Sequence, residues 1–259
     1  MKVLIVTQTA PLYLGWFIHD LVQNLQETKD VELQGVVAFS PIFKKSTFEE
    51  AKARLALYGP WNFLKLMGAI LAGKVLSPFI APHKTFSRLE PVLKHHGLPL
   101  FRYARPNDVA LLKQLEEADL MVSIACPKIL SKEIFQLPTQ GSINYHTGAL
   151  PRYRGRQPLY WAMLNGEKEV GITVHRMAEE VDAGPILHQK MVDIQGIKSL
   201  HEVYLKTLPK GVEVLTQTIK DLSHDCPQES PNDIHQHTPN SFPEKKEGQR
   251  FRSLGLRII

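Results

Sequence analysis

The chain has 259 residues, of which 43% are hydrophobic and 22% are charged, and its formal net charge at pH 7 is +5. This composition is typical of a globular protein with a sizeable core, and it excludes a disordered, low-complexity or fibrous chain. The mild positive charge is compatible with an anionic substrate such as a nucleotide, a folate or tRNA, but it does not require nucleic acid.

The two cysteines, Cys126 and Cys226, lack the spacing of a zinc site or a redox pair. We therefore expect no metal centre and a reducing compartment. The chain begins with Met-Lys and a strand-like VLIV rather than a secretory or transit signal, which favours a cytoplasmic location.

The first elements form a crossover unit of a parallel sheet. Lys2 to Val6 and Leu33 to Phe39 are short apolar runs that predict buried strands, and Leu14 to Gln26 has apolar residues on a helical period. The loop Gln8 to Pro11 is then at the carboxyl end of the first strand, where open parallel sheets bind ligands. It lacks Gly-x-Gly-x-x-Gly, so we predict no dinucleotide there.

Residues 41–83 predict a helical insertion. Ser46 begins a possible helix, Gly59-Pro60 interrupts the chain, and Trp61 to Ile80 is apolar but contains Lys65 and Lys74. This stretch is too interrupted for a transmembrane helix, which needs about 20 apolar residues. It favours a buried or partner-facing helix; the alternative is an interfacial helix that makes a weak membrane contact.

The middle of the chain continues the alternation of helices and strands. Ser87 to His96 predicts a helix that ends at Gly97, and Leu98 to Tyr103 predicts a strand. Asn107 is the expected cap of a helix that runs through Leu115, and Leu120 to Ile124 is a further apolar strand. The adjacent His95 and His96 point in different directions on a helix, so we interpret them as partners of the helix dipole.

The stretch from Gly141 to Leu187 organises the chain. A strand through Ile143 places Asn144 and His146 at alternate positions, so both side chains share one face. Leu150-Pro151 ends this strand. A helix at Gln157 to Leu164 and strands at Gly171 to Met177 and Pro185 to Ile194 follow. The loop between these strands presents Asp182.

An asparagine, a histidine and an aspartate suit the transfer of an acyl group to an amine. Attack on a formyl carbon creates an oxyanion that Asn144 and a protonated His146 could stabilise, while Asp182 holds the imidazolium and helps to remove the proton. No Gly-x-Ser-x-Gly motif is present in this stretch, which favours direct transfer. Asp182 could equally be only a turn residue, and the alternation Arg152-x-Arg154-x-Arg156 is either an anion site or a solvated basic edge.

The last part of the chain predicts a long helix and a tail. Ser199 to Glu202 is a capping box, and an apolar stripe follows to Leu222, which Pro209 is expected to kink or split. Pro, Ser, Asn, Gln and His dominate from His224 onward. We therefore predict a catalytic domain at 1–223 and an extended tail at 224–259. The fold class is α/β, with an open, mostly parallel, twisted sheet and helices on both faces.

The ordered motifs of this chain resemble the signature of the folate-dependent formyltransferase family. The matching positions are Asn144-x-His146, Leu150-Pro151, Arg154-Gly155, Pro158, Trp161, Asn165-Gly166, Gly171-x-Thr173 and Asp182-x-Gly184-x-Ile186. The resemblance implies a Rossmann-like fold, a catalytic trio of Asn144, His146 and Asp182, and 10-formyltetrahydrofolate as the co-substrate. It also implies a pterin pocket lined by residues Ile129, Leu130, Val181, Ala183 and Gly184. Family members usually read His-Pro-Ser-Leu-Leu-Pro where this chain has Thr147-Gly148-Ala149 after His146.

We therefore expect an N-formyltransferase that acts on a small amine, such as an amino sugar on a nucleotide. Methionyl-tRNA formyltransferases resemble the chain in its catalytic half but have a further barrel domain, and the residues after 224 are few for an independent domain. We accordingly do not expect tRNA as the acceptor. The alternatives are formyltetrahydrofolate hydrolase and, outside the enzymes, a folate-binding protein without turnover. The sequence does not predict the oligomeric state.

Overall fold

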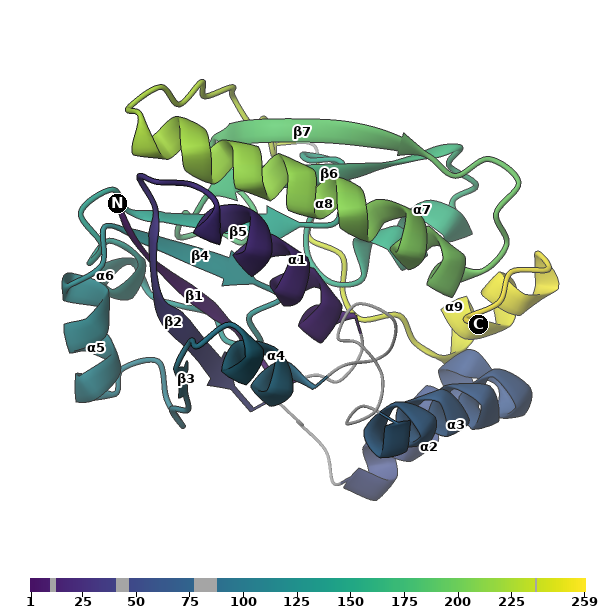
Figure 1. The fold of residues 1–259 in the computed structure, drawn as a ribbon. Helices are drawn as coiled ribbons and strands as arrows, with labels where there is room; N and C mark the ends of the chain where they lie inside the picture. The colour runs from purple at the N-terminus through teal and green to yellow at the C-terminus, as the bar shows by residue number, and fades with distance from the viewer. Residues whose placement is uncertain (10–12, 41–46, 77–87, 236) are drawn as a thin grey trace.

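The computed structural model describes residues 1–9, 13–40, 47–76, 88–235 and 237–259 (Figure 1). The strands in chain order are β1 (Lys2–Gln8), β2 (Glu32–Phe39), β3 (Leu100–Phe101), β4 (Leu120–Ile124), β5 (Ser142–His146), β6 (Glu169–Arg176) and β7 (Ile186–Asp193). The helices are α1 (Leu14–Gln26), α2 (Thr47–Tyr58), α3 (Pro60–Leu76), α4 (Leu89–His95), α5 (Val109–Glu116), α6 (Lys132–Phe135), α7 (Pro158–Leu164), α8 (Leu200–Ser223) and α9 (Lys245–Ser253).

Within these residues the strands form a single seven-stranded sheet in the order β3-β2-β1-β4-β5-β6-β7. The pairs from β3 to β5 are parallel, whereas β6 and β7 add an antiparallel edge. The strand order reverses between β1 and β4. Ligands bind outside the carboxyl ends of the strands at such switch points, and β5 lies next to this one. The predicted open, mostly parallel sheet is confirmed.

Helices cover both faces of the sheet, as predicted. Helices α1 and α8 lie together over one face, and α5 and α6 lie over the other (Figure 1). The larger core contains the apolar side chains of the first face, including Ile143 and Tyr145 of β5. The smaller core contains Leu4, Met121 and Leu130 on the opposite face. Because β5 alternates, Asn144 and His146 lie on the face of the smaller core.

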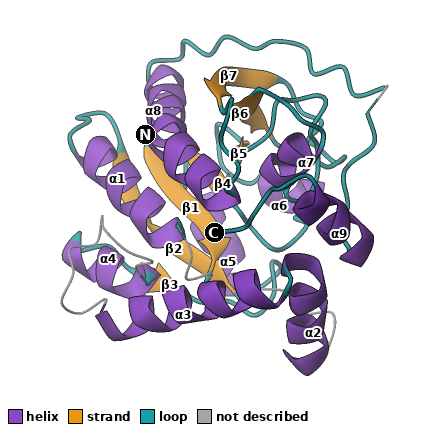
Figure 2. Cartoon of the chain, turned by 90° about the vertical axis from the view of Figure 1, so that its right-hand side faces the viewer, coloured by secondary structure: helices purple, strands orange, loops and turns teal. Residues whose placement is uncertain are grey.

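Helices α2 and α3 of the expected insertion lie beside the sheet and pack against each other, and α2 also packs against α9 (Figure 2). The predicted start at Ser46 and the end of the apolar stretch, residues 77–80, lie outside the described residues. In the part of the chain that is described, no helix is long and apolar enough to cross a membrane.

Three expected details differ in the structure. The N-cap of α5 is Asp108, whose carboxylate accepts a hydrogen bond of 3.1 Å from Ala110 N, rather than Asn107. The strand expected at Leu98 to Tyr103 is limited to Leu100–Phe101. Helix α8 continues through Pro209 as one element, so it is not split there. Proline removes one backbone hydrogen bond, but the buried stripe on both sides of it keeps the helix packed on the sheet.

The tail expected to be extended contains α9. Phe251 of this helix is 2% exposed and stacks on Tyr160 of α7, with ring centroids 4.4 Å apart. Its sequence, KKEGQRFRS, has one aromatic anchor among polar residues, so no helical stripe was visible. A tertiary contact, rather than local periodicity, stabilises this helix.

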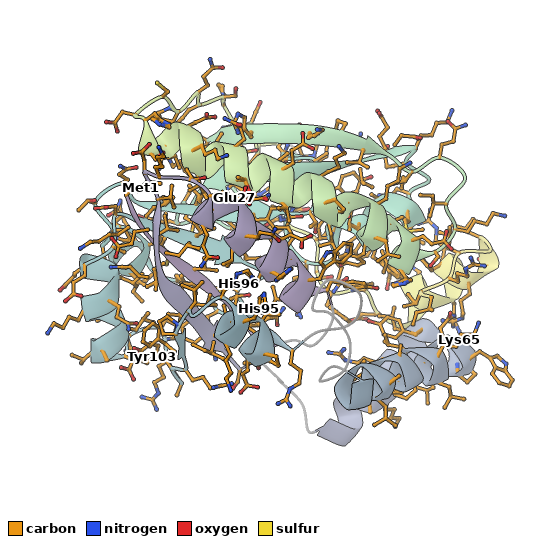
Figure 3. All side chains as sticks on the ribbon, viewed as in Figure 1. Met1, Glu27, Lys65, His95, His96 and Tyr103 are labelled. Atoms are coloured by element: carbon orange, nitrogen blue, oxygen red, sulfur yellow. The ribbon has the colours of Figure 1, made fainter. Side chains whose placement is uncertain are left out.

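His95 and His96 lie where α4 meets α1 (Figure 3). His96 Nε2 is 2.8 Å from His19 Nδ1, and His96 Nδ1 is 3.0 Å from Gln26 Oε1. Burial lowers the pKa of His96, and the neighbouring His19 lowers it further. His96 therefore joins two helices in addition to its expected place near a helix end.

Candidate active site

Strands β5 and β6 place polar side chains on one face of the sheet. Asn144 and His146 are two positions apart on β5, and Asn144 is paired directly with His175 of β6. His146 is 6% and His175 2% exposed. Imidazole groups buried in this way need hydrogen-bond partners, because an unpaired buried polar group costs about 1–3 kcal/mol.

The loop after β6 brings Asp182 to these residues. Asp182 Oδ1 accepts a hydrogen bond of 3.3 Å from Asn144 Nδ2, and Oδ2 lies 3.5 Å from His146 Nδ1. Gly155 N donates to Oδ2 at 2.8 Å. Asp182 has a φ of 50°, a left-handed conformation that aspartate adopts more readily than most residues. Asp182 is thus a turn residue and also lies next to Asn144 and His146, as expected from the sequence.

His146 is held by a backbone carbonyl. Its Nε2 lies 2.6 Å from the oxygen of Tyr153, a contact in which only the ring nitrogen can be the donor. Burial lowers the pKa of His146, although Asp182 and the Tyr153 contact oppose this change. The neutral ring then has its lone pair on Nδ1, which agrees with a separation from Asp182 that is longer than a normal hydrogen bond. This arrangement differs from the expected imidazolium.

Whereas His146 favours its neutral form, Asp182 favours its charged form. Burial alone would raise the pKa of its carboxyl, but the attraction of His146 in its protonated form, the contact with His175 and the Gly155 N–H together lower it to about 2. The carboxylate is therefore ionised near neutral pH. With a neutral imidazole and an ionised carboxylate, the pair of His146 Nδ1 and Asp182 Oδ2 can take up one proton.

This lowered pKa predicts a specific loss of stability in acid. A carboxyl whose folded pKa is about 2, against 3.8 for a free aspartate, stabilises the fold fully above pH 3.8 and loses this contribution as the pH falls through 2. The contribution is about 2 kcal/mol, and Asp182→Asn lacks it. Urea denaturation measures the free energy of unfolding of wild type and variant at pH 5 and at pH 2. The difference between the two proteins should shrink by this amount at the lower pH. A difference that does not change with pH would contradict the prediction.

His175 was not predicted as a site residue. Its Nε2 is 3.2 Å from Asn144 Nδ2 and 3.5 Å from Asp182 Oδ1, and its Nδ1 is 2.7 Å from the carbonyl oxygen of Arg176. The signal for it was the alternation Thr173-x-His175, which puts a second imidazole on the polar face of β6. Only the register between β5 and β6 shows that it meets Asn144.

The residues expected to line a pterin pocket lie in different surroundings. Ile129 is 81% exposed, whereas Leu130 is 6% exposed and packs in the smaller core. Val181 is 40% exposed, Ala183 is partly buried, and Gly184 is buried. Val181 to Gly184 therefore flank Asp182, while Ile129 and Leu130 do not face one common surface. A hollow of about 230 Å³ lies elsewhere, next to Gly166, Gln195 and Leu256.

Gly148 explains how His146 can reach the Tyr153 carbonyl. A Cβ at this position would lie 2.6 Å from His146 Nε2 and 2.6 Å from Tyr153 O. Any side chain at this position would press on both atoms, so glycine leaves space for the imidazole to approach the carbonyl.

In the arginine alternation, Arg152 and Arg156 are exposed, as expected for a solvated basic edge, whereas Arg154 is buried. Arg154 is 1% exposed; it donates to Val181 O at 2.6 and 3.0 Å and pairs with Glu180 at 2.8 Å. It therefore fixes the loop that contains Asp182. Arg152 pairs with Glu167 at the surface, and Arg156 lies over the ring of Phe242.

The fold and these groups define an α/β protein with an antiparallel sheet extension and a buried cluster of titratable side chains on β5, β6 and the following loop. The family profile described as "Formyl transferase" matches residues 83–219, more than half of the chain. The chain belongs to the formyl transferase family, whose members are enzymes that transfer formyl groups.

Individual relatives agree with this assignment. The methionyl-tRNA formyltransferase of Halalkalibacterium halodurans is 37% identical over 167 residues, which cover 63% of this chain and 52% of that protein. The matched regions span about half the length, or less, of the curated relatives.

Solved structures share the fold. The phosphoribosylglycinamide formyltransferase from Anaplasma phagocytophilum is similar with a TM-score of 0.61 and 17% identity, over 87% of this chain and 88% of that one. A sugar 3N-formyl transferase, solved in the presence of dTDP and 5-N-formyl-THF, is similar with a TM-score of 0.57 and 15% identity, over 100% of this chain and 82% of that one.

Proposed function

We propose that this chain is a folate-dependent N-formyltransferase that transfers the formyl group of 10-formyltetrahydrofolate to the amine of a small acceptor. The observation that supports this function most strongly is the cluster in which Asp182 lies within 3.3 Å of Asn144 and 3.5 Å of His146. Family membership supports the same reaction class. Residues 1–223 are proposed to form the catalytic domain, and residues 224–259 its tail.

The chemistry assigns each group a role. The acceptor nitrogen attacks the formyl carbon and forms the new C–N bond, which places negative charge on the formyl oxygen. Asn144 Nδ2 stabilises this oxyanion as a hydrogen-bond donor. The proton of the attacking nitrogen passes to Nδ1 of His146, where Asp182 stabilises the resulting imidazolium. Collapse of the intermediate then breaks the bond to the folate nitrogen, which takes up a proton as it leaves.

Asp182 alone is a poor proton acceptor for this step. A carboxylate with a pKa of about 2 is a weak base near neutral pH, whereas a general base works best near the operating pH. The ordinary pKa of an imidazole, 6.5, is nearer that range, and Asp182 opposes the lowering that burial causes in His146. Asp182 therefore acts through its charge on His146, which is why both residues are needed.

Substrate must replace an existing contact of Asn144. Its Nδ2 approaches Asp182 Oδ1 at 3.3 Å and His175 Nε2 at 3.2 Å, both longer than the usual 2.9–3.0 Å. These weak contacts are more easily exchanged than the 2.6 Å contact of His146 with Tyr153. Asn144 is accordingly the donor that turns to the oxyanion.

We favour an amino sugar on a nucleotide as the acceptor. Supporting this choice, the sugar 3N-formyl transferase with dTDP and a formyl-folate resembles the whole length of this chain. Methionyl-tRNA, as in the curated relatives, is the alternative acceptor. Hydrolysis with water as acceptor, and folate binding without turnover, are further outcomes.

The test uses the full chain with 10-formyltetrahydrofolate and separate acceptors: amino-sugar nucleotides, aminoacylated initiator tRNA, or water alone. We expect a formylated amino-sugar product by mass spectrometry. Formylation of the tRNA alone would move the assignment to the alternative acceptor, and donor hydrolysis alone would move it to the hydrolase. Donor binding without any product would contradict the proposed enzyme.

We further propose that α3 contacts an anionic membrane surface. Trp61, Leu64 and Leu71 are 76%, 61% and 64% exposed and recur at helical spacing along one side of α3. Lys65, one turn after Trp61, is exposed beside them (Figure 3). Exposed aromatic and leucine side chains next to lysine suit an interfacial helix.

Sedimentation with vesicles of phosphatidylcholine and phosphatidylserine tests this contact. Wild type is expected to sediment with the vesicles, and Leu64→Asp is expected to reduce the bound fraction severalfold. Val109→Asp, which places the same charge at a residue 80% exposed on α5, is the control and should bind as wild type does. If wild type does not bind the vesicles, or if all variants bind equally well, the proposed membrane contact of α3 is refuted.

A further inference from the structure

The segment after α8 runs across the candidate active site. Ser230 is bridged to Ile186 at the start of β7, and Asn240 is bridged to Gly155. Asn240 N donates to Arg154 O at 2.8 Å, and Arg156 N donates to Asn240 O at 2.9 Å. This segment lies beyond residue 219, where the match to the family profile ends. Figure 1 shows it as the yellow-green chain that follows α8.

Asn232 of this segment holds the loop of Asp182 directly. Its Nδ2 donates to the carbonyl oxygen of Asp182 at 3.0 Å and to that of Gly184 at 2.9 Å. The two bonds join both ends of the turn around Ala183. Asn232 Oδ1 is buried and makes no hydrogen bond with the residues that the structure describes. The amide therefore contributes to the turn through its N–H groups.

The turn needs such support. The left-handed conformation of Asp182 costs about 1–2 kcal/mol relative to ordinary backbone. The same conformation directs the carboxylate to Gly155 N, and Gly155 is itself bridged to Asn240. Asn232 thus holds Asp182 from its backbone side, and Asn240 holds Gly155, the partner of its carboxylate.

We propose that Asn232 is a positioning residue that fixes the Asp182 carboxylate against His146 and Gly155. This inference rests on the proposed function for its catalytic consequence. Without the two bonds of Asn232, the turn relaxes, the Gly155 bond lengthens and the carboxylate loses part of its stabilisation. The pKa of Asp182 then rises, and the His146 pair accepts a proton less effectively.

The test compares full-length variants. Asn232→Leu keeps a similar side-chain volume without donors, whereas Asn232→Gln keeps the amide and should rescue in part. Glu229→Gln is the matched control, because Glu229 pairs with Arg176 in the same segment but has no described contact with the Asp182 loop. Carbon-13 NMR of the Asp182 carboxylate follows its titration, and steady-state kinetics separate kcat from KM.

For Asn232→Leu we expect the pKa of Asp182 to rise by at least about one unit and kcat to fall about tenfold, with KM of the acceptor changed less than twofold. Glu229→Gln should change neither. An unchanged titration of Asp182 in folded Asn232→Leu would overturn the proposal, whatever the activity. If wild type transfers no formyl group, the proposed function fails, but the NMR titration still decides whether Asn232 positions Asp182.

Discussion

His146→Ala is expected to lower kcat for formyl transfer at least about a thousandfold while the protein remains folded. The substitution removes the Nδ1 atom that receives the proton, and it takes away the contact of His146 with the Tyr153 carbonyl, whereas Asp182 Oδ2 keeps its bond to Gly155 N. The effect should be on kcat rather than on KM of the donor, because the imidazole acts on the reacting atoms. Steady-state kinetics with the best acceptor of the panel measure it.

The matched control for this variant is His188→Ala. His188 lies on β7, its side chain is 37% exposed, and it bonds to Thr218 of α8, away from the Asp182 loop. Its substitution should leave kcat within about twofold of wild type. A folded His146→Ala protein that retains more than about a tenth of the wild-type kcat would exclude the role given to this imidazole.

Gly184→Ala is expected to have the largest effect on stability. A Cβ at this position would collide with the carbonyl oxygen of Arg176 on β6, so the backbone of the loop or of the strand must move. Overpacking of this kind costs about 1–3 kcal/mol, which for a chain of this size lowers Tm by several degrees, about 2–4 °C per kcal/mol. Because Gly184 O accepts from Asn232, the displaced loop should also lose activity.

Thermal unfolding by circular dichroism measures this prediction, with Gly68→Ala as the control. Gly68 lies within α3, and a Cβ there would have no atom within 4 Å. Alanine is the better helix former, so the control should be unchanged or more stable by up to about 1 kcal/mol. Equal Tm values for Gly184→Ala and wild type would show that the close approach to β6 is unimportant.

Much of the fold follows from local patterns in the sequence. Helix α1 has the predicted bounds, and β4 spans the predicted Leu120 to Ile124, because both have an uninterrupted apolar signal. The alternation around Ile143 also predicted that Asn144 and His146 share a face. These features depend on neighbours in the sequence, which is why composition and periodicity suffice.

The parts that were not predicted depend on contacts between distant segments. His175 meets Asn144 only through the antiparallel register of β5 and β6. Arg154 is buried because it binds the carbonyl of Val181, and no local pattern distinguishes it from the exposed Arg152. The tail residue Asn232 reaches the Asp182 loop across 50 positions of sequence. Short polar stretches give no periodic signal for such contacts.

In the proposed mechanism His146 accepts the proton of the attacking amine, and the charge of Asp182 stabilises the imidazolium that forms. Single-turnover formyl transfer as a function of pH, for wild type and Asp182→Asn, tests it most directly. Asparagine tolerates the left-handed turn, so the backbone should be retained. We expect the wild-type rate to decline in acid as the imidazole is protonated, and the variant to be slower by at least about a hundredfold at every pH. Superimposable rate profiles of the two proteins would contradict the claim.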